Sequence, residues 1–445
     1  MQVSSQDLTT IYTLKQNLID FVLDAEDELA KALENYAAKQ VRRGFSDNLK
    51  QDTIVENFAF EGDQNYSPID LFLQTNPQLS ESEKNLIKTW HQSFMGLFAV
   101  NQILADGFEV MNWLTAKNYL VKPDNQKTQQ ELSRLKVGEI IHTRLIPITS
   151  NEWTFANSYI LMGKLGKPKL AVAIGNFKDN YKQHLYSDAP ELLTEAWESV
   201  EIYHQEFQDF FHADEVTMSG YQLSQNINEF QEIITKKRLE AAGIDPSKSF
   251  AEIIETSEEQ EEIINRAAEA GVDQKLVSQI LNSKTSTAKM ITPKVDLPAE
   301  IKKADEVTAI SDPRWGQMFL ATYTKMKSIL AAENWRDIEG SEKLIRFYLE
   351  DKSINSLIWH RLAEIYPRQL ESILREILNR PEFKLVTELN LVLEEFNKFT
   401  EPDLPETASV PTHLHNLFQE AFAEVNKSKT KGKAQKVTTK GFQRN

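Results

Sequence analysis

The densest group of reactive side chains lies in the closing stretch, residues 425–445, VNKSKTKGKAQKVTTKGFQRN. It has seven basic residues and no acidic one, a composition that suits contact with phosphate or carboxylate groups. These residues are Lys427, Lys429, Lys431, Lys433, Lys436, Lys440 and Arg444. Without them, 43 of the 50 basic residues remain against 66 acidic ones, so the rest of the chain carries −23. We therefore expect a disordered basic tail, 427–445, on a body that repels polyanions.

A second pattern lies in residues 266–284, RAAEAGVDQKLVSQILNSK. A small residue, a glycine four positions later and three apolar residues are spaced as in a helix-turn-helix. They are Ala267, Gly271, Val272, Val277 and Ile280. The stretch resembles the start of LacI-type repressor domains. If it bound DNA, the side chains facing the major groove would be Gln274, Lys275, Ser278, Gln279 and Asn282. The preceding run ETSEEQEEIINR is acidic, however, and lacks the basic groups that contact phosphate. This favours a structural or protein-binding helical hairpin.

A third group of residues could bind single-stranded nucleic acid. Its aromatic members could stack on bases while its basic members follow the phosphates, as on an OB-like barrel. The aromatic members are Trp113, Tyr119, Trp153, Phe155 and Tyr159, and the basic members are Lys117, Lys122, Lys136 and Arg144. Aromatic side chains are more often core residues, so we expect most of them to fill the interior.

Patterns for catalysis or metal binding are weak. Glu201 and His204 form one E-x-x-H, whereas a di-iron bundle needs two such pairs and further carboxylates. His413 and His415 lie about 200° apart on a helix and cannot chelate together. The chain has no cysteine, which excludes disulfides and cysteine-ligated metals. We expect no catalytic residue, no metal and no cofactor, and we interpret the protein as a non-enzyme.

The elements that would position these residues suggest a mostly helical α+β protein with a small antiparallel β-barrel or curled sheet between helical parts. An apolar stripe from Ile11 to Tyr36 predicts one helix of about thirty residues. Ser80 or Ser82 caps another helix, Asp106-Gly107 predicts a hairpin, and KPKLAVAIG reads as the last of six strands. Asp312-Pro313 reads as a helix start.

The resulting domain plan alternates helical parts with linkers. We expect a helical N-terminal region, a small antiparallel β domain, a helical region with the hairpin, a linker, a second helical domain, a second linker, an amphipathic helix and the tail. The N-terminal region is 1–92, the β domain 93–178 and the helical region with the hairpin 187–283. The first linker is 284–311, the second helical domain 312–398 and the second linker 399–411. The amphipathic helix is 412–426 and the tail 427–445.

Four stretches together resemble a family of uncharacterised proteins of cyanobacteria. They are GKPKLAVAIGNFK, LYSDAPELLTEAWESVEIYH, DPRWGQMFLATY and VPTHLHNLFQEAFAEVNKSK. The resemblance implies a bacterial protein and carries no activity with it. The first residues have no basic and apolar signal pattern, and no apolar run reaches the ~18 residues of a membrane span. We expect a cytoplasmic location.

These observations favour a non-catalytic interaction or assembly protein, an adaptor whose tail contacts an anionic partner. Protein partners are expected, together with weak, salt-dependent contact with nucleic acid or another anionic surface. The alternative is a nucleic-acid-binding regulator that uses residues 266–284 or the β domain. The sequence leaves the oligomeric state open.

Overall fold

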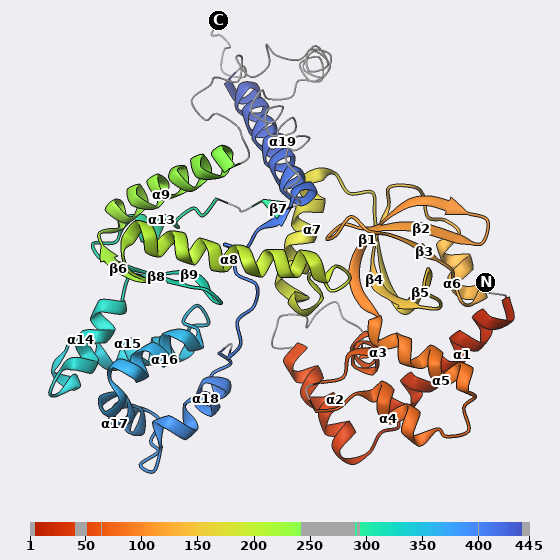
Figure 1. Cartoon of the computed structure of the whole chain (residues 1–445), viewed down its shortest axis with the longest axis horizontal. Helices are drawn as coiled ribbons and strands as arrows, with labels where there is room; N and C mark the ends of the chain where they lie inside the picture. The colour runs from red at the N-terminus through yellow and green to blue at the C-terminus, as the bar shows by residue number, and fades with distance from the viewer. Residues whose placement is uncertain are drawn as a thin grey trace, which may run out of the picture. The chain divides into compact units, whose positions relative to one another are not determined.

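The computed structural model confirms a mostly helical α+β chain, drawn in Figure 1. No helix in the described part of the chain is both long and apolar enough to cross a bilayer. The chain divides into unit 1, residues 1–193 with 411–445, and unit 2, residues 194–410. The structure describes residues 5–40, 51–63, 65–241, 290–291, 294–398 and 400–437.

Unit 1 begins with helices that share one core around Leu18, Phe58 and Trp90. The predicted single helix over residues 11–36 is wrong, because the chain breaks after Leu23 and restarts at Asp27 with a φ of 55°. Aspartate tolerates this left-handed conformation better than most residues. The helices are α1 (Ser5–Leu23), α2 (Asp27–Gln40), α3 (Gln51–Glu61), α4 (Pro68–Thr75) and α5 (Glu81–Thr89), followed by a 3-10 turn, Trp90–Gln92.

The start of α5 confirms the predicted cap at Ser80. The Ser80 hydroxyl accepts a hydrogen bond from the Glu83 amide, and the Glu83 carboxylate accepts one from the Ser80 amide at 2.8 Å. This reciprocal pair is a capping box, which satisfies two amides that the helix itself cannot.

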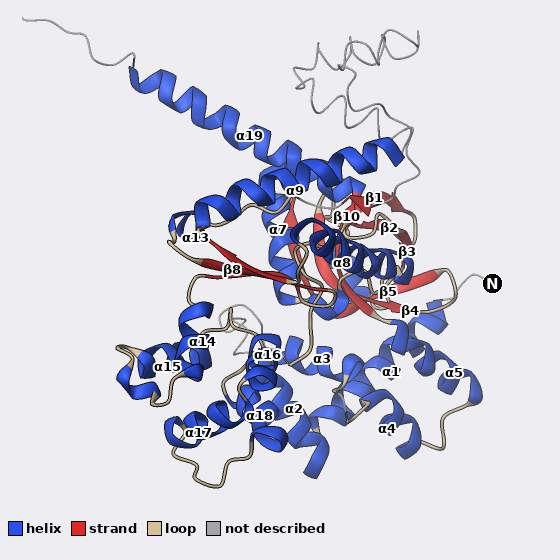
Figure 2. Cartoon of the chain, turned by 60° about the vertical axis from the view of Figure 1, so that its left-hand side comes forward, coloured by secondary structure: helices blue, strands red, loops and turns tan. Residues whose placement is uncertain are grey.

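Five strands follow, and they pair in the closed order β1-β2-β3-β5-β4. The hairpin at Asp106-Gly107 is confirmed, because Leu104 pairs with Gly107. The expectation of an all-antiparallel sheet is wrong, because β3 and β5 run parallel where Leu120 pairs with Glu152. The strands, red in Figure 2, are β1 (Phe94–Leu104), β2 (Gly107–Asn112), β3 (Asn118–Val121), β4 (Ile140–Pro147) and β5 (Glu152–Gly163).

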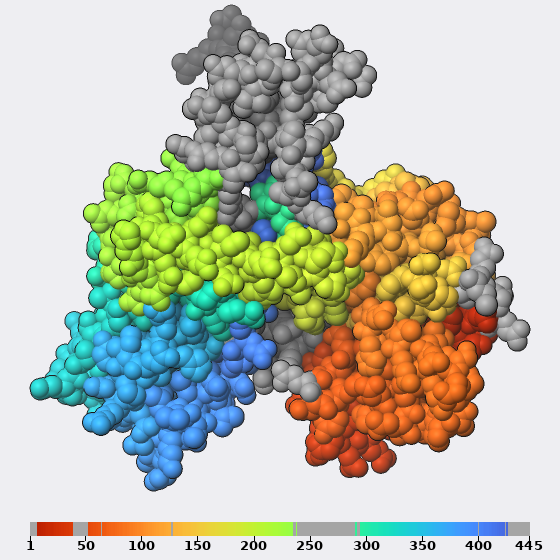
Figure 3. Space-filling model, in the orientation of Figure 1, coloured from red at the N-terminus to blue at the C-terminus, as the bar shows by residue number. Residues whose placement is uncertain are grey.

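The barrel packs directly on the N-terminal helices, since Ile146 and Ala156 belong to the same core cluster as α1 and α3. Figure 3 shows the red and orange residues of the helices meeting those of the barrel in one continuous surface on this face. The barrel interior has its own core around Phe98, Val110 and Phe155. This packing holds α1 and α3 against β5.

KPKLAVAIG is not a strand, which corrects the prediction of a sixth one. It begins α7 (Lys167–Asn180), with Gly166 at the N-cap and a proline in the first turn. Leu170, Ile174 and Phe177 are its buried face, at the spacing of a helix. A short apolar run fits a strand and a buried helix equally well, which explains the error. The other helical segments are α6 (Gln126–Leu132), η3 (Lys182–His184) and α19 (Thr412–Val437).

Helix α19 packs on α7 and runs further than the expected 412–426. Among the residues of α19 whose side chains are described, Leu414, Leu417 and Ala421 are buried, all in the first ten positions. The backbone stays helical to Val437, through a stretch whose sequence is mostly polar and basic. This explains why the amphipathic pattern predicted an earlier end.

Unit 2 contains a three-stranded sheet in the order β6-β8-β9, so it is not purely helical as expected. Phe207 and Phe230 share one core with Val307 and Ala309 of β8. The described part of the expected linker 284–311 carries regular structure. The elements are α8 (Pro190–Phe211), β6 (Glu215–Met218), α9 (Gly220–Ala241), β7 (Met290–Ile291), α13 (Ala299–Lys303), β8 (Val307–Asp312) and β9 (Gly316–Leu320).

Asp312-Pro313 does not begin a helix, which corrects another prediction. The Asp312 carboxylate accepts hydrogen bonds from the amides of Arg314 and Trp315 at 2.8 and 2.9 Å. An N-cap makes the same bonds, so the local sequence looks alike in both cases. Here Gly316, with a φ of +70°, turns the chain back into β9. Arg314 then stacks on the Trp197 ring of α8 at 4.2 Å.

The rest of unit 2 is helical and encloses a core around Tyr348, Trp359 and Leu374. This agrees with the helices expected after the linker. The helices are α14 (Tyr323–Ala331), η4 (Trp335–Asp337), α15 (Ser341–Glu350), α16 (Ser356–Ile365), α17 (Pro367–Ile377) and α18 (Leu385–Glu395), before the short strand β10 (Val410–Pro411).

Candidate functional site

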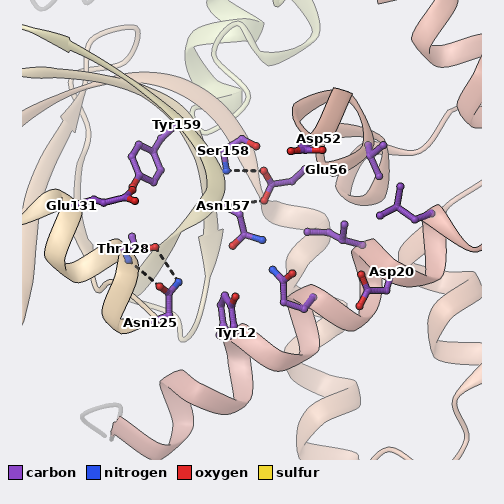
Figure 4. A pocket seen from close by; sticks show the side chains of 14 residues that line it. Tyr12, Asp20, Asp52, Glu56, Asn125, Thr128, Glu131, Asn157, Ser158 and Tyr159 are labelled. Atoms are coloured by element: carbon purple, nitrogen blue, oxygen red, sulfur yellow. Dashed lines mark hydrogen bonds between the residues drawn. The ribbon is translucent and has the colours of Figure 1, made fainter. Parts of the chain in front are cut away.

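A groove of about 520 Å³ lies in unit 1 between α1, α3, α6 and β5 (Figure 4). Its lining is polar and acidic, and none of the lining residues is lysine, arginine or histidine. On α1 the lining residues recur every three or four positions, which places them on one face of the helix. They are Tyr12, Gln16, Ile19, Asp20 and Leu23 from α1, Asp52, Val55 and Glu56 from α3, Asn125, Thr128 and Glu131 at α6, and Asn157, Ser158 and Tyr159 from β5.

Glu56 joins α3 to the edge of β5 in the groove wall. Its carboxylate accepts hydrogen bonds from the amides of Asn157 and Ser158 at 2.7 and 2.8 Å. The pairing of β5 with β4 shifts register between Thr143 and Leu145, which leaves these amides outside the ladder. Glu56 is buried and thus replaces a strand partner at this bulge.

Lys15 joins α1 to the barrel behind the groove. Its ammonium lies 2.6 Å from the Asp124 carboxylate and donates a hydrogen bond to the Phe155 carbonyl at 2.7 Å. The Lys15 side chain is fully buried, so both contacts are shielded from water. This lysine lies on the apolar stripe of α1, next to Leu14 and Leu18, where the sequence pattern leads one to expect a core residue.

At the far wall, the Tyr159 hydroxyl donates a hydrogen bond to the Glu131 carboxylate of α6. Burial, and then the neighbouring Glu131, raise the pKa of Tyr159 above its usual range. The hydroxyl therefore stays protonated at any physiological pH. Asn125 caps α6 by accepting a hydrogen bond from the Thr128 amide at 2.8 Å, which fixes the helix that carries Glu131.

A buried ionic cluster links the N-terminal helices to β4. Glu61, at the end of α3, contacts Arg144 and accepts hydrogen bonds from His184 at 2.7 Å and Tyr36 at 2.9 Å. Burial alone would raise the pKa of Glu61, but Arg144 and His184 outweigh it and lower that pKa to about 2. Glu61 is therefore ionised at neutral pH and compensates the charge of the buried Arg144.

His142 lies next to this cluster, with its ring edge-on to Phe177 and Tyr181 at centroid distances of 5.7 and 4.9 Å. Burial and then the charge of His184 lower the pKa of His142 to about 4. Its Nε2 atom has no hydrogen-bond partner among the described residues. The ring is neutral at physiological pH and serves as an aromatic packing residue.

The aromatic residues considered for base stacking lie mainly in the barrel. Phe155 is 1% exposed, and Tyr119, Trp153 and Tyr159 pack against the same core. The rings of Tyr119 and Trp153 meet edge-on at 5.3 Å. Trp113 is half-buried. These rings fill the interior more than they form a flat outer surface.

The basic residues considered for phosphate contact are mostly engaged with acidic groups. Lys122 lies 3.0 Å from Asp106 and 2.8 Å from Glu152, with a side chain 9% exposed. Arg144 is in the buried cluster with Glu61. Lys136 is exposed, so the residues proposed as a phosphate track do not converge on one open face.

Lys117 belongs to a socket that holds Asp188, just before α8. The Asp188 carboxylate accepts hydrogen bonds from Asn112 at 3.0 Å, Thr115 at 2.8 Å and Tyr119 at 2.6 Å. Lys117 donates to the Asp188 carbonyl at 2.7 Å. Burial and then Asp188 raise the pKa of Tyr119, so its hydroxyl remains a donor. The barrel face formed by β2 and β3 is thus occupied by the chain itself.

Sequence reasoning missed the groove, the Glu61 cluster and the Asp188 socket. Each joins residues more than 60 positions apart, as Lys15 and Phe155 do across 140 positions. Separations of this size leave no local periodicity. The one available signal was Lys15, a charged residue on the apolar stripe of α1.

The tail residues and the helix-turn-helix candidates fall partly or wholly outside the described residues. The backbone of Lys427, Lys429, Lys431, Lys433 and Lys436 continues α19, whereas Lys440 and Arg444 lie beyond it. All of residues 242–289 are outside the described part of the chain. The residues proposed to face the DNA major groove all lie in this range: Gln274, Lys275, Ser278, Gln279 and Asn282.

The histidines singled out by the sequence have ordinary partners. His204 lies 3.1 Å from the Ser311 hydroxyl, and His413 pairs with the Trp113 carbonyl at 2.8 Å. Within the described ranges, no group of three or more histidines and carboxylates could hold a metal ion. His413 instead helps to fix the start of α19 on the barrel.

No protein family, no curated protein and no solved structure matches the chain. The resemblances to a cyanobacterial family and to a LacI-type helix-turn-helix therefore stay predictions.

Proposed function

We propose that this protein is a non-catalytic interaction or assembly protein whose basic C-terminal residues contact an anionic partner. The observation that carries the proposal is the division of α19 into an anchored half and a basic half. Among its residues whose side chains are described, the buried positions Leu414, Leu417 and Ala421 all lie before residue 422, and the tail lysines begin at Lys427. Such a helix would present its charges from a fixed base.

The anchored half is attached by both apolar and polar contacts. Leu414 and Leu417 are buried, and α19 packs along α7. Glu420 lies 3.0 Å from Lys167 at the start of α7. His413 contacts the Trp113 carbonyl on the barrel. These contacts support a rigid base, because apolar burial and a tertiary hydrogen bond act at the same end of the helix.

The charge distribution supports an anionic partner for the tail rather than for the body. The chain outside the tail carries −23, and Lys122 and Arg144 on the barrel are compensated by carboxylates. A polyanion approaching the body meets net repulsion, whereas the tail attracts it. Contact through lysines alone would be weak and would fall steeply with salt.

One observation favours the alternative, a nucleic-acid-binding regulator. A five-stranded barrel with parallel β3 and β5 and a helix, α6, between β3 and β4 is typical of OB-folds, which often bind oligonucleotides. Against it, Asp188 occupies the β2–β3 face that such folds use. We therefore rank this alternative second.

The proposal is tested by affinity purification of the full chain and of a charge-neutral variant from cells. The variant replaces the six tail lysines with glutamine and carries Arg444→Gln. We expect the unaltered chain to recover partners at low salt. These partners should be lost when the variant is used, and also when the unaltered chain is washed at high salt. A nuclease-treated sample distinguishes nucleic-acid partners from protein partners. Recovery of the same partners with both chains would refute the proposal.

A further inference from the structure

The groove between α1, α3, α6 and β5 contains carboxylates that take no part in holding the fold together. Glu56 and Glu131 have structural partners, since they bind the β5 amides and the Tyr159 hydroxyl. Asp20 on α1 and Asp52 on α3 are exposed and form no ion pair with a described basic residue. Two carboxylates therefore face a cavity whose described lining has no basic side chain.

The cavity also suits a cationic segment of a protein chain better than an anion. About 520 Å³ is within the range of sites that hold a small ligand or a few residues of a chain. In Figure 4, Asp20 lies further along α1 than Tyr12, and Asp52 lies near Glu56 and Ser158. Tyrosine faces and carboxylates both attract an ammonium group, whereas phosphate is repelled. The groove thus selects a segment with lysine or arginine side chains.

The chain itself contains such a segment at its C-terminus. Residues 427–445 carry seven basic groups and no acidic one, so they complement the groove in charge. In Figures 1 and 2, α19 runs away from α1 toward its Val437 end. The described end of α19 therefore lies away from the groove of its own chain, which favours the groove of another molecule as its partner.

We propose that the groove binds the basic C-terminal segment of a second copy of this protein. This inference rests on the proposed function, because it names the anionic partner of the tail. Tail and groove are different surfaces, so the contact is heterologous and each molecule keeps one free groove and one free tail. The association therefore continues head to tail, into a ring or a chain of copies.

The contact is reversible and sensitive to salt. Asp20 and Asp52 are exposed, so each ion pair that they form contributes little and is screened at physiological ionic strength. Removing the charges of Asp20 and Asp52 should weaken the association by about 2- to 30-fold, the range expected for two such pairs.

The experiment uses three full chains, studied by sedimentation velocity at 25 and 300 mM salt over a range of concentrations. One is unaltered, one carries Asp20→Asn and Asp52→Asn, and one is the charge-neutral tail variant. A matched control, Asp305→Asn, changes an exposed carboxylate in unit 2. The unaltered chain and the control should self-associate at low salt, and either altered chain alone should do so far less.

Mixing the two altered chains gives the sharpest result. One retains a working tail and the other a working groove, so the mixture should form a 1:1 dimer that grows no further. An unaltered chain that stays monomeric at low salt, or a groove variant that associates as strongly as the unaltered chain, would overturn the inference. The groove variant should still bind a single-stranded RNA oligonucleotide through its tail, and loss of binding by the tail variant alone tests the proposed function separately.

Discussion

Replacing Glu61 with glutamine is the substitution whose effect the structure specifies most closely. Glu61 is 15% exposed, and it faces an Arg144 side chain that is 1% exposed. Glutamine preserves the shape but leaves the arginine charge buried without compensation. Breaking one partner of a buried pair typically costs about 3–5 kcal/mol. We expect a loss of this size in the stability of unit 1 at neutral pH.

The pH dependence gives an independent value for the same interaction. The pKa of Glu61 falls from 4.5 to about 2 on folding. A shift of this size corresponds to roughly 3 kcal/mol of stability, at about 1.4 kcal/mol per unit. Because the pKa of a carboxylate is lowered, the stabilisation is fully present above pH 4.5 and is lost as the pH falls toward 2. The Glu61→Gln variant should lack this part of the acid dependence.

Hydrogen–deuterium exchange with mass spectrometry can measure the effect locally in a chain of two units. Peptides from α3 and β4 should exchange faster in the variant, while those from α16 and α17 stay unchanged. Glu28→Gln is a matched control, since Glu28 pairs with Lys31 on the surface at 62% exposure. Equal protection of α3 in the variant and the unaltered chain at pH 7 would refute the reasoning.

Three further substitutions test other contacts by thermal and chemical unfolding. Lys15→Met leaves Asp124 buried without its cation, so unit 1 should lose about 3–5 kcal/mol; a loss below 1 kcal/mol would contradict the burial of this pair. Ser80→Ala removes the α5 cap and should cost about 1 kcal/mol, and no change would mean that water replaces the hydroxyl. Gly316→Ala places a methyl group 2.6 Å from Pro405 at a φ of +70°, so the stability of unit 2 should fall by at least ~1–2 kcal/mol. An unchanged stability of unit 2 would show that the turn relaxes freely.

Local signals predicted the elements that depend on neighbouring residues. The Ser80 cap, the Asp106-Gly107 hairpin and the periodic helix α8 all follow from contacts within a few positions. The errors lie where two structures share a local pattern. KPKLAVAIG is apolar enough for a strand but forms α7, and Asp312 forms a turn with the bonds of a helix cap.

The groove could not be predicted, because its walls come from segments that tertiary packing brings together. Asp20 and Asp52 look like ordinary surface acids in the sequence, and their position becomes informative only beside β5. The segregation of basic residues into the tail, by contrast, is a property of composition alone. The sequence therefore predicts an anionic partner for the tail, whereas the position of the acidic groove comes from the structure alone.

The central claim, that the tail and not the body contacts anions, is tested most directly by the salt dependence of binding. The affinity of the full chain for a fluorescent single-stranded RNA oligonucleotide, used as a simple polyanion, would be measured by anisotropy between 20 and 200 mM salt. If all seven tail charges engage, the slope of log K against log salt approaches about −5. We expect such a slope for the unaltered chain and little binding for the charge-neutral variant. Equal affinities and slopes for the two chains would contradict the account.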